Sequence, residues 1–142
     1  MHPQRVAIRF PGTHDGFATA FDQLRDALDA GELCGTPRFN TELVFEEMVA
    51  NIINHGVDGA RELTVAVTLE TRADTIVLTF EDDGIAFDPR DHKPVPLRSL
   101  DEERNGGFGL VLVRHAARSV DYERTALGHN RVTITLARAE VA

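Results

Sequence analysis

Two consecutive segments of the chain, residues 63–70 and 75–81, alternate apolar and polar side chains with a period of two. In the first segment, threonine and alanine alternate with Leu63, Val65, Val67 and Leu69. This period places the apolar side chains on one face of a strand. The intervening Arg72-Ala73-Asp74 predicts a turn, so the two segments should form an antiparallel hairpin with one buried face. Such a hairpin needs other elements to cover that face.

Three other segments have the spacing of helices that can provide the cover. Apolar side chains recur at helical intervals from Phe17 to Leu28, and Gly31 predicts the end of that helix. Thr36-Pro37 resembles an N-cap followed by proline in the first turn, and an apolar stripe continues from there to Gly56. A third helix is expected over residues 110–118.

The remaining segments complete an α+β domain. Residues 6–10 predict a strand that ends at Pro11-Gly12, and residues 120–124 and 132–137 predict a second hairpin around residues 128–130. Residues 86–105 contain three prolines and many charges, which indicates a mobile loop. We therefore expect a single domain over residues 1–142, a two-layer sandwich of helices on a mixed, mostly antiparallel sheet.

The composition limits the possible partners. The 142 residues include 15 Lys and Arg against 23 Asp and Glu, a net charge of -8. Binding to nucleic acid needs clustered Lys and Arg, so no nucleic-acid partner is expected. No segment approaches the roughly 20 apolar residues of a membrane span, and the single cysteine, Cys34, excludes an internal disulfide. We expect a cytoplasmic protein with no membrane contact and with Cys34 as a buried structural thiol.

Glu47, Asn51 and His55 follow one another at intervals of four residues in the second predicted helix. This spacing places them on one helical face. A carboxylate there can accept a proton from an attacking hydroxyl, and an amide oxygen can bind Mg²⁺. Glu46 and Asn54 are the competing neighbours. We prefer Glu47 to Glu46 as the base because Glu47 lies one turn from Asn51.

Two further motifs suggest a nucleotide site. Asp82-Asp83-Gly84 follows a predicted strand, where the Asp82 carboxylate can accept a hydrogen bond from the amino group of adenine and Gly84 allows a close approach of the backbone. The run Asn105-Gly106-Gly107-Phe108-Gly109-Leu110 precedes a predicted helix, so its backbone N–H groups can converge on phosphate. It lacks the Gly-Lys-Ser/Thr of a P-loop and the acidic residue of a Rossmann motif.

In this order the three segments resemble the ATP-binding fold shared by type II topoisomerases, MutL proteins and histidine kinases. Glu47-x-x-x-Asn51 resembles the N box, Asp82-x-Gly84 the first glycine box, and Gly107-x-Gly109-Leu110 the second. The chain is most similar to the small anti-sigma-factor serine kinases of the RsbW type, through the strings from Glu47 to Gly56 and from Asp82 to Pro89.

The resemblance implies a Bergerat-type fold with ATP and Mg²⁺ as cofactors. It makes Glu47 the catalytic base, Asn51 the Mg²⁺ ligand and Asp82 the adenine reader. The remaining ATP-binding positions would be His55, Gly84, Ala86, Gly106, Gly107, Phe108, Gly109 and Leu110. The first glycine box normally ends in glycine, and here Ala86 occupies that position. Its methyl group would narrow the approach to the nucleotide.

The partners that the resemblance implies are a sigma factor or other effector, which the protein sequesters, and a small antagonist, which it phosphorylates on serine. A homodimer is also implied. One alternative is a partner-binding module that binds ATP without kinase activity. Another is the catalytic fragment of a histidine kinase, but none of the six histidines lies in a typical phosphoacceptor motif. A topoisomerase-like ATPase would need a further domain.

Overall fold

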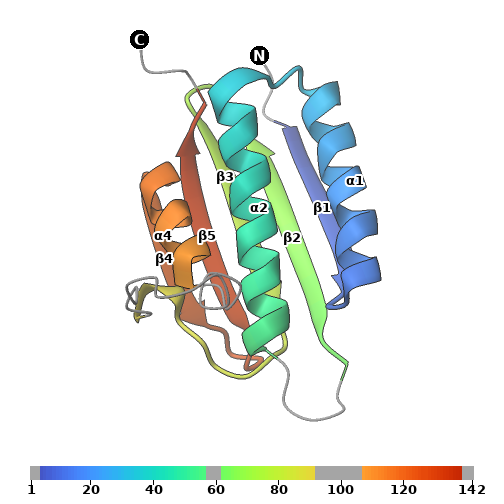
Figure 1. Ribbon diagram of the computed structural model, residues 1–142, viewed down its shortest axis with the longest axis vertical. Coiled ribbons are helices and arrows are strands. Elements are labelled where there is room, and N and C mark those ends of the chain that lie inside the picture. The colour runs from blue at the N-terminus through green and yellow to red at the C-terminus, as the bar shows by residue number, and fades with distance from the viewer. Residues whose placement is uncertain (1–3, 57–61, 92–106, 139–142) are drawn as a thin grey trace.

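The computed structural model describes residues 4–56, 62–91 and 107–138. In these residues, three α-helices cover one face of a five-stranded sheet (Figure 1). The elements are β1 (Gln4–Pro11), α1 (His14–Ala30), α2 (Gly35–His55), β2 (Thr64–Thr71), β3 (Thr75–Asp82), the 3-10 helix η1 (Pro89–Asp91), α4 (Gly107–Ala116), β4 (Ser119–Arg124) and β5 (Asn130–Ala137). The α+β class and the two-layer arrangement are confirmed.

The sheet has the strand order β1-β2-β3-β5-β4, and every pair of described neighbours is antiparallel. The two predicted hairpins are present as β2–β3 and β4–β5. The mostly antiparallel character is confirmed, but no described pair is parallel, so these strands do not form a mixed sheet. Two helices, α1 and α2, connect β1 to its antiparallel neighbour β2. The last strand, β5, follows β4 in the chain and lies between β3 and β4 in the sheet.

The first helix begins at His14 and ends where its sequence predicts, at Gly31. The hydroxyl of Thr13 caps α1 by accepting a hydrogen bond of 3.0 Å from the Gly16 N–H, and Gly31 occupies the C-cap. The second helix begins earlier than expected. Cys34 holds the N-cap position of α2 and forms no side-chain cap, so Thr36 lies inside the first turn rather than before it.

Two other expectations need correction. Cys34 is exposed, because it lies in the turn between α1 and α2 rather than in the core. The third predicted helix spans Gly107–Ala116 rather than residues 110–118, so part of the glycine run lies within its first turn. Most of the loop expected over residues 86–105 lies outside the described residues, and the part that is described contains η1.

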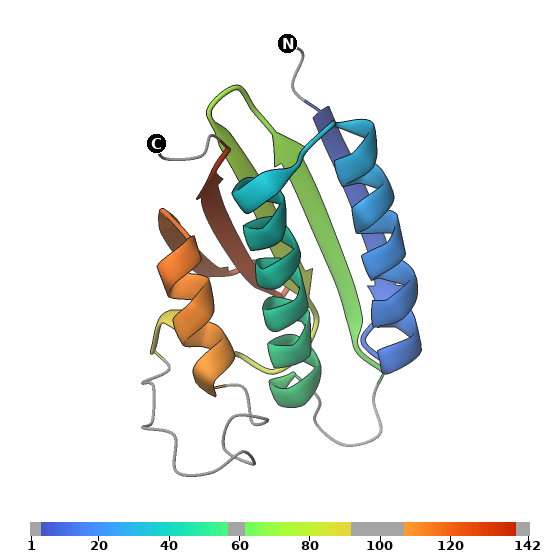
Figure 2. The same cartoon turned by 45° about the horizontal axis from the view of Figure 1, so that its top comes forward.

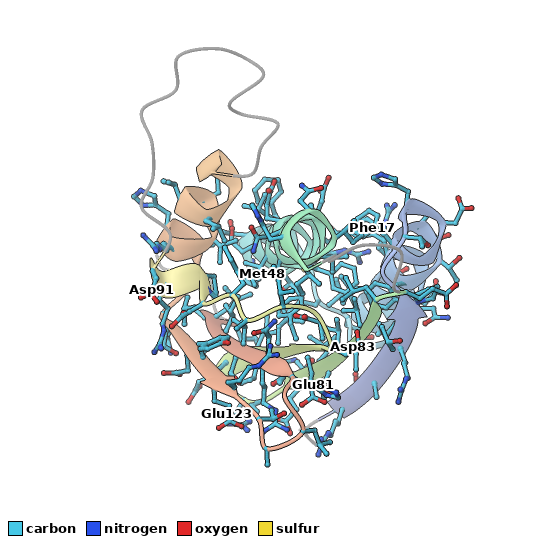
Figure 3. The ribbon with its side chains drawn as sticks, turned by 90° about the horizontal axis from the view of Figure 1, so that it is seen from below. Phe17, Met48, Glu81, Asp83, Asp91 and Glu123 are labelled. Atoms are coloured by element: carbon cyan, nitrogen blue, oxygen red, sulfur yellow. The ribbon has the colours of Figure 1, made fainter. Side chains whose placement is uncertain are left out.

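Helix α2 occupies the centre of the helical layer (Figure 2). Its Phe45 is fully buried, and its ring lies near four other aromatic rings on β1, α1 and β3: Phe10, Phe17, Phe21 and Phe80. Figure 3 shows Met48 between α2 and the sheet, with Glu81 and Glu123 on the opposite face of the sheet. The apolar face therefore carries the core, as the alternation predicts.

No described helix has the length and apolar character needed to cross a bilayer.

Candidate functional site

The polar face predicted for α2 points toward α4 and the end of β3. Asn51 is 3% exposed, whereas Glu47 and His55 are partly buried. The two competitors, Glu46 and Asn54, are both exposed. A helical rotation of about 100° per residue explains this difference between adjacent side chains. The structure thus places Glu47 and Asn51, rather than their neighbours, against other elements of the fold.

The Glu47 carboxylate lies against the first turn of α4. A Cβ atom placed on Gly109 would be 2.0 Å from Glu47 Oε2 and 2.9 Å from its Cδ, so a side chain at this position would force the carboxylate to move. Burial raises the pKa of Glu47 above its ordinary value, and the negative charge of Glu46 raises it further. A carboxyl group with a raised pKa is a better proton acceptor when ionised.

Asn51 has the properties of an oxygen ligand that lacks its partner. Its Oδ1 is buried and forms no hydrogen bond with any described residue. A buried amide oxygen without a partner costs free energy, and Mg²⁺ is a hard cation that prefers such oxygens. No three described His, Cys, Asp or Glu side chains form a metal cage of their own. Asn51 Oδ1 therefore fits the role of a protein ligand for Mg²⁺, which would supply positive charge beside bound phosphate.

Asp82 ends β3 on the inner face of the sheet and is 5% exposed. Its Oδ1 accepts hydrogen bonds from the Gly84 N–H at 2.9 Å and from Asn130 Nδ2 at 3.1 Å. Burial raises the pKa of Asp82, although these two hydrogen bonds oppose the shift. The described residues donate no hydrogen bond to Oδ2. One carboxylate oxygen is therefore held by the protein, and the other remains able to accept from a ligand.

Gly84 brings the segment after β3 directly against the end of α2. A Cβ atom on Gly84 would lie 2.6 Å from Gly56 O and 2.8 Å from Gly56 Cα. The Ile85 N–H also donates to Gly56 O at 3.3 Å. Ala86, by contrast, is exposed. The close approach predicted at this motif is thus between Gly84 and the protein's own backbone.

A narrow hollow connects Asn51 with Asp82. The free space inside it is about 10 Å³, which is room for about one water molecule and far less than a ligand pocket holds. Its wall includes His55, whose ring stacks on Phe87 with centroids 4.9 Å apart and an interplanar angle of 1°. Ala86 does not line this hollow. The methyl group that was expected to narrow the approach therefore lies away from the described hollow.

The glycine run lies only partly within the described residues. Gly106 lies outside them, while Gly107, Phe108, Gly109 and Leu110 form the first turn of α4. Leu110 is 4% exposed and belongs to the core. The backbone N–H groups of a first helical turn have no partners within the helix. The start of α4 therefore offers donors beside Glu47, although Leu110 itself serves in packing.

Asn130 is a site residue that was not predicted; it is 3% exposed and its Nδ2 donates a hydrogen bond to Asp82. The signal was present, because Asn130 shares the inward positions of β5 with three apolar residues, Val132, Ile134 and Leu136. A polar side chain at a buried position of an alternating strand needs hydrogen-bond partners. The stacking of Phe87 on His55 was not predicted either.

Helices on one face of an antiparallel sheet form the architecture of this domain, and its sequence matches a family of ATPase domains, which implies ATP binding. The chain belongs to the histidine kinase-like ATPase domain family, whose sequence model matches residues 10–136. It is 34% identical over 99 residues to the serine/threonine-protein kinase BtrW of Bordetella bronchiseptica, a match that covers 69% of each chain. The expected likeness to RsbW-type proteins is confirmed.

Solved structures share the same fold. The RsbU and RsbW domains of a Mycobacterium tuberculosis protein match with a TM-score of 0.60 at 17% identity, over 98% of this chain. The chain spans about a third (34%) of that longer structure. The SiaB–SiaC complex of Pseudomonas aeruginosa matches with a TM-score of 0.58 at 13% identity, over 93% of this chain and 89% of the other. At such identities these matches establish the fold alone.

Proposed function

We propose that this chain is an ATP-dependent protein-serine kinase of a partner-switching system. The observation that carries the proposal is the contact between Glu47 and Gly109. It places a carboxylate with a raised pKa beside the first turn of α4, one helical turn from the orphaned amide oxygen of Asn51. Phosphoryl transfer depends mainly on positioning and on the stabilisation of charge.

Each residue has a defined task in this proposal. Asp82 Oδ2 would accept a hydrogen bond from the amino group of adenine, and Asn51 Oδ1 would hold Mg²⁺. When bound, the ion would neutralise charge on the phosphate oxygens. The hollow is too small for a nucleotide, so ATP would lie at its mouth, with the phosphates near the first N–H groups of α4. Glu47 would accept the proton of the substrate serine. The serine oxygen would then bond to the γ-phosphorus as the bond from that phosphorus to ADP breaks and ADP leaves.

The similarity to BtrW, named as a serine/threonine-protein kinase, supports serine as the acceptor. The fold shared with an RsbW domain and with the SiaB–SiaC complex supports a protein partner. We therefore propose that the substrate is a small antagonist protein, and that the chain also sequesters a sigma factor or another effector. A homodimer completes the proposal.

The test begins with a pull-down of partners with and without ATP, followed by incubation of the captured proteins with γ-labelled ATP. We expect label on serine of one small partner. Glu47→Gln should retain ATP binding and lose transfer, while Glu46→Gln, an identical change at the exposed neighbour, should retain both. Transfer by Glu47→Gln at the wild-type rate would show that Glu47 is not the base.

Other outcomes of the same experiment identify the alternatives. Capture of a partner without label on any protein would favour a module that binds ATP only to control its shape. Label that is lost in acid would indicate phosphohistidine and the catalytic fragment of a histidine kinase. Among the described histidines, His14 begins α1, a helix that packs on the sheet and so serves the core.

A further inference from the structure

The side-chain amide of Asn130 connects more elements of the site than any residue discussed above. Nδ2 donates to Asp82 Oδ1 at 3.1 Å and to the Ile85 carbonyl at 2.7 Å. Oδ1 accepts from the Phe87 N–H at 3.1 Å, from the Tyr122 hydroxyl at 2.6 Å and from Arg124 Nη1 at 3.1 Å. The amide thus joins the end of β3, the segment that follows it, and β4.

These partners permit only one orientation of the amide. The nitrogen faces two acceptors, a carboxylate and a carbonyl, while the oxygen faces three donors. A rotation of the amide by 180° would place its oxygen against the Asp82 carboxylate and its nitrogen against donors. Because both changes leave buried groups without partners, the rotated form is strongly disfavoured.

The position of Asn130 explains why this clamp acts on Asp82. The two residues are direct cross-strand partners in the β3–β5 register. Asn130 and the Gly84 N–H both donate to the same oxygen, Oδ1, which fixes the carboxylate from two directions, and Asp82 is among the residues that line the hollow. Arg124 supports the arrangement from its other side, because Nη1 also donates to Gly84 O at 3.1 Å.

We propose that Asn130 is a positioning residue for recognition of the base: its amide, held by Tyr122 and Arg124, aims Asp82 Oδ2 at the 6-amino group of a bound purine. This inference rests on the proposed function, because it assumes that ATP binds with its base beside Asp82. It differs from a purely structural role for Asn130 in one measurable respect. Loss of the clamp should weaken binding that depends on the 6-amino group and leave the remaining binding intact.

The test compares ATP with purine riboside triphosphate, which has hydrogen in place of the 6-amino group. Asn130→Asp keeps the shape of the side chain and its acceptor oxygen but replaces the donor to Asp82 with a second carboxylate. We expect the affinity for ATP to fall about tenfold, while the affinity for purine riboside triphosphate changes less than about twofold. Asn54→Asp is the control, since it adds the same charge at an exposed asparagine.

The pH dependence provides a second readout. Two carboxylates this close share a proton, so the carboxyl group introduced by Asn130→Asp would, once protonated, again donate to Asp82. The ATP affinity of the variant should therefore recover as pH falls, and that of the wild-type protein should not rise. If Asn130→Asp does not fold, Tyr122→Phe is the second variant, because it removes one donor to Asn130 Oδ1. It should reduce the affinity for ATP about threefold and leave the affinity for purine riboside triphosphate nearly unchanged.

The outcomes separate this inference from the proposed function. An equal loss of affinity for both nucleotides, or no loss for either, would overturn the positioning role while ATP binding stands. If the wild-type protein binds neither nucleotide, the proposed function fails and this inference fails with it.

Discussion

The carboxylate of Glu47 on α2 lies against Gly109 on α4, where a single methyl group would displace it. The two residues lie far apart in the sequence, yet each is suited to the other. Glycine at this position costs helix stability relative to alanine. Alanine at this position would therefore favour the helix but force the Glu47 carboxylate to move.

The contact predicts that Gly109→Ala separates stability from catalysis. The new methyl group would meet only the end of a flexible side chain, so the fold should persist, and alanine should add up to about 1 kcal/mol of helix stability. A displaced base should slow phosphoryl transfer about 100-fold, with ATP affinity nearly unchanged. Thermal unfolding, ATP titration and single-turnover transfer test this. The double variant Gly109→Ala with Glu47→Gln should transfer phosphate no more slowly than Glu47→Gln alone. If the two losses of rate multiply fully, Gly109 does not act through Glu47.

The raised pKa of Glu47 predicts the acid limit of activity. A base must be ionised, so transfer should decline as pH falls through this pKa, at a higher pH than for an ordinary glutamate. Glu46→Gln removes one of the two causes of the shift and should move the decline to lower pH without changing the plateau. Asp26→Asn, at an exposed carboxylate on α1, should leave the profile in place. An unchanged profile in Glu46→Gln would refute the assignment of Glu47 as the titrating base.

Asp82 is expected to lower the stability of the unliganded protein. Because its pKa is raised on folding, the folded chain binds this proton more tightly than the unfolded chain does. Stability is therefore lost as pH rises through the unfolded and then the folded pKa, and the loss is complete above the folded pKa. Asp82→Asn should gain about 1 kcal/mol at neutral pH and lose ATP binding. Urea unfolding at several pH values should show the gain shrinking in acid; a constant gain would point to another cause.

Asn51 should make ATP binding depend on Mg²⁺. Its buried Oδ1 has no hydrogen-bond partner among the described residues, so Asn51→Leu should not destabilise the unliganded protein by more than about 1 kcal/mol. ATP titrations with and without Mg²⁺ should differ for the wild-type protein and coincide for the variant. Asn54→Leu, at an exposed asparagine on the same helix, should retain the difference. A Mg²⁺ dependence that survives in Asn51→Leu would exclude Asn51 as the ligand.

The two ends of the first glycine box should differ in their response to substitution. Gly84→Ala would push a methyl group into the backbone of Gly56, which cannot move without shifting the end of α2. We expect it to cost about 2 kcal/mol of stability and most of the ATP affinity. Ala86 is exposed and does not line the hollow, so Ala86→Gly should change ATP affinity by less than about threefold, roughly 0.6 kcal/mol. A tenfold gain on Ala86→Gly would show that this methyl group does obstruct the nucleotide.

Local patterns determined much of the fold. The period-two alternation of residues 63–70 and 75–81 predicts both strands of the first hairpin, because the apolar face must be buried whatever covers it. The end of α1 at Gly31 and the placement of Glu47 and Asn51 on one helical face follow in the same way from the geometry of a single helix. The start of α4 was placed too late, since propensity does not reveal that glycines lie within a helical turn.

The sequence by itself thus determined the two-layer class, the hairpins and the order of the site motifs, because these depend on contacts between near neighbours in the chain. Only the tertiary structure decided that Gly109 makes room for Glu47, that Gly84 lies on Gly56, and that Asn130 holds Asp82. Each of these pairs joins different elements. Their distances depend on how helices and strands pack and on strand register, which no local pattern encodes.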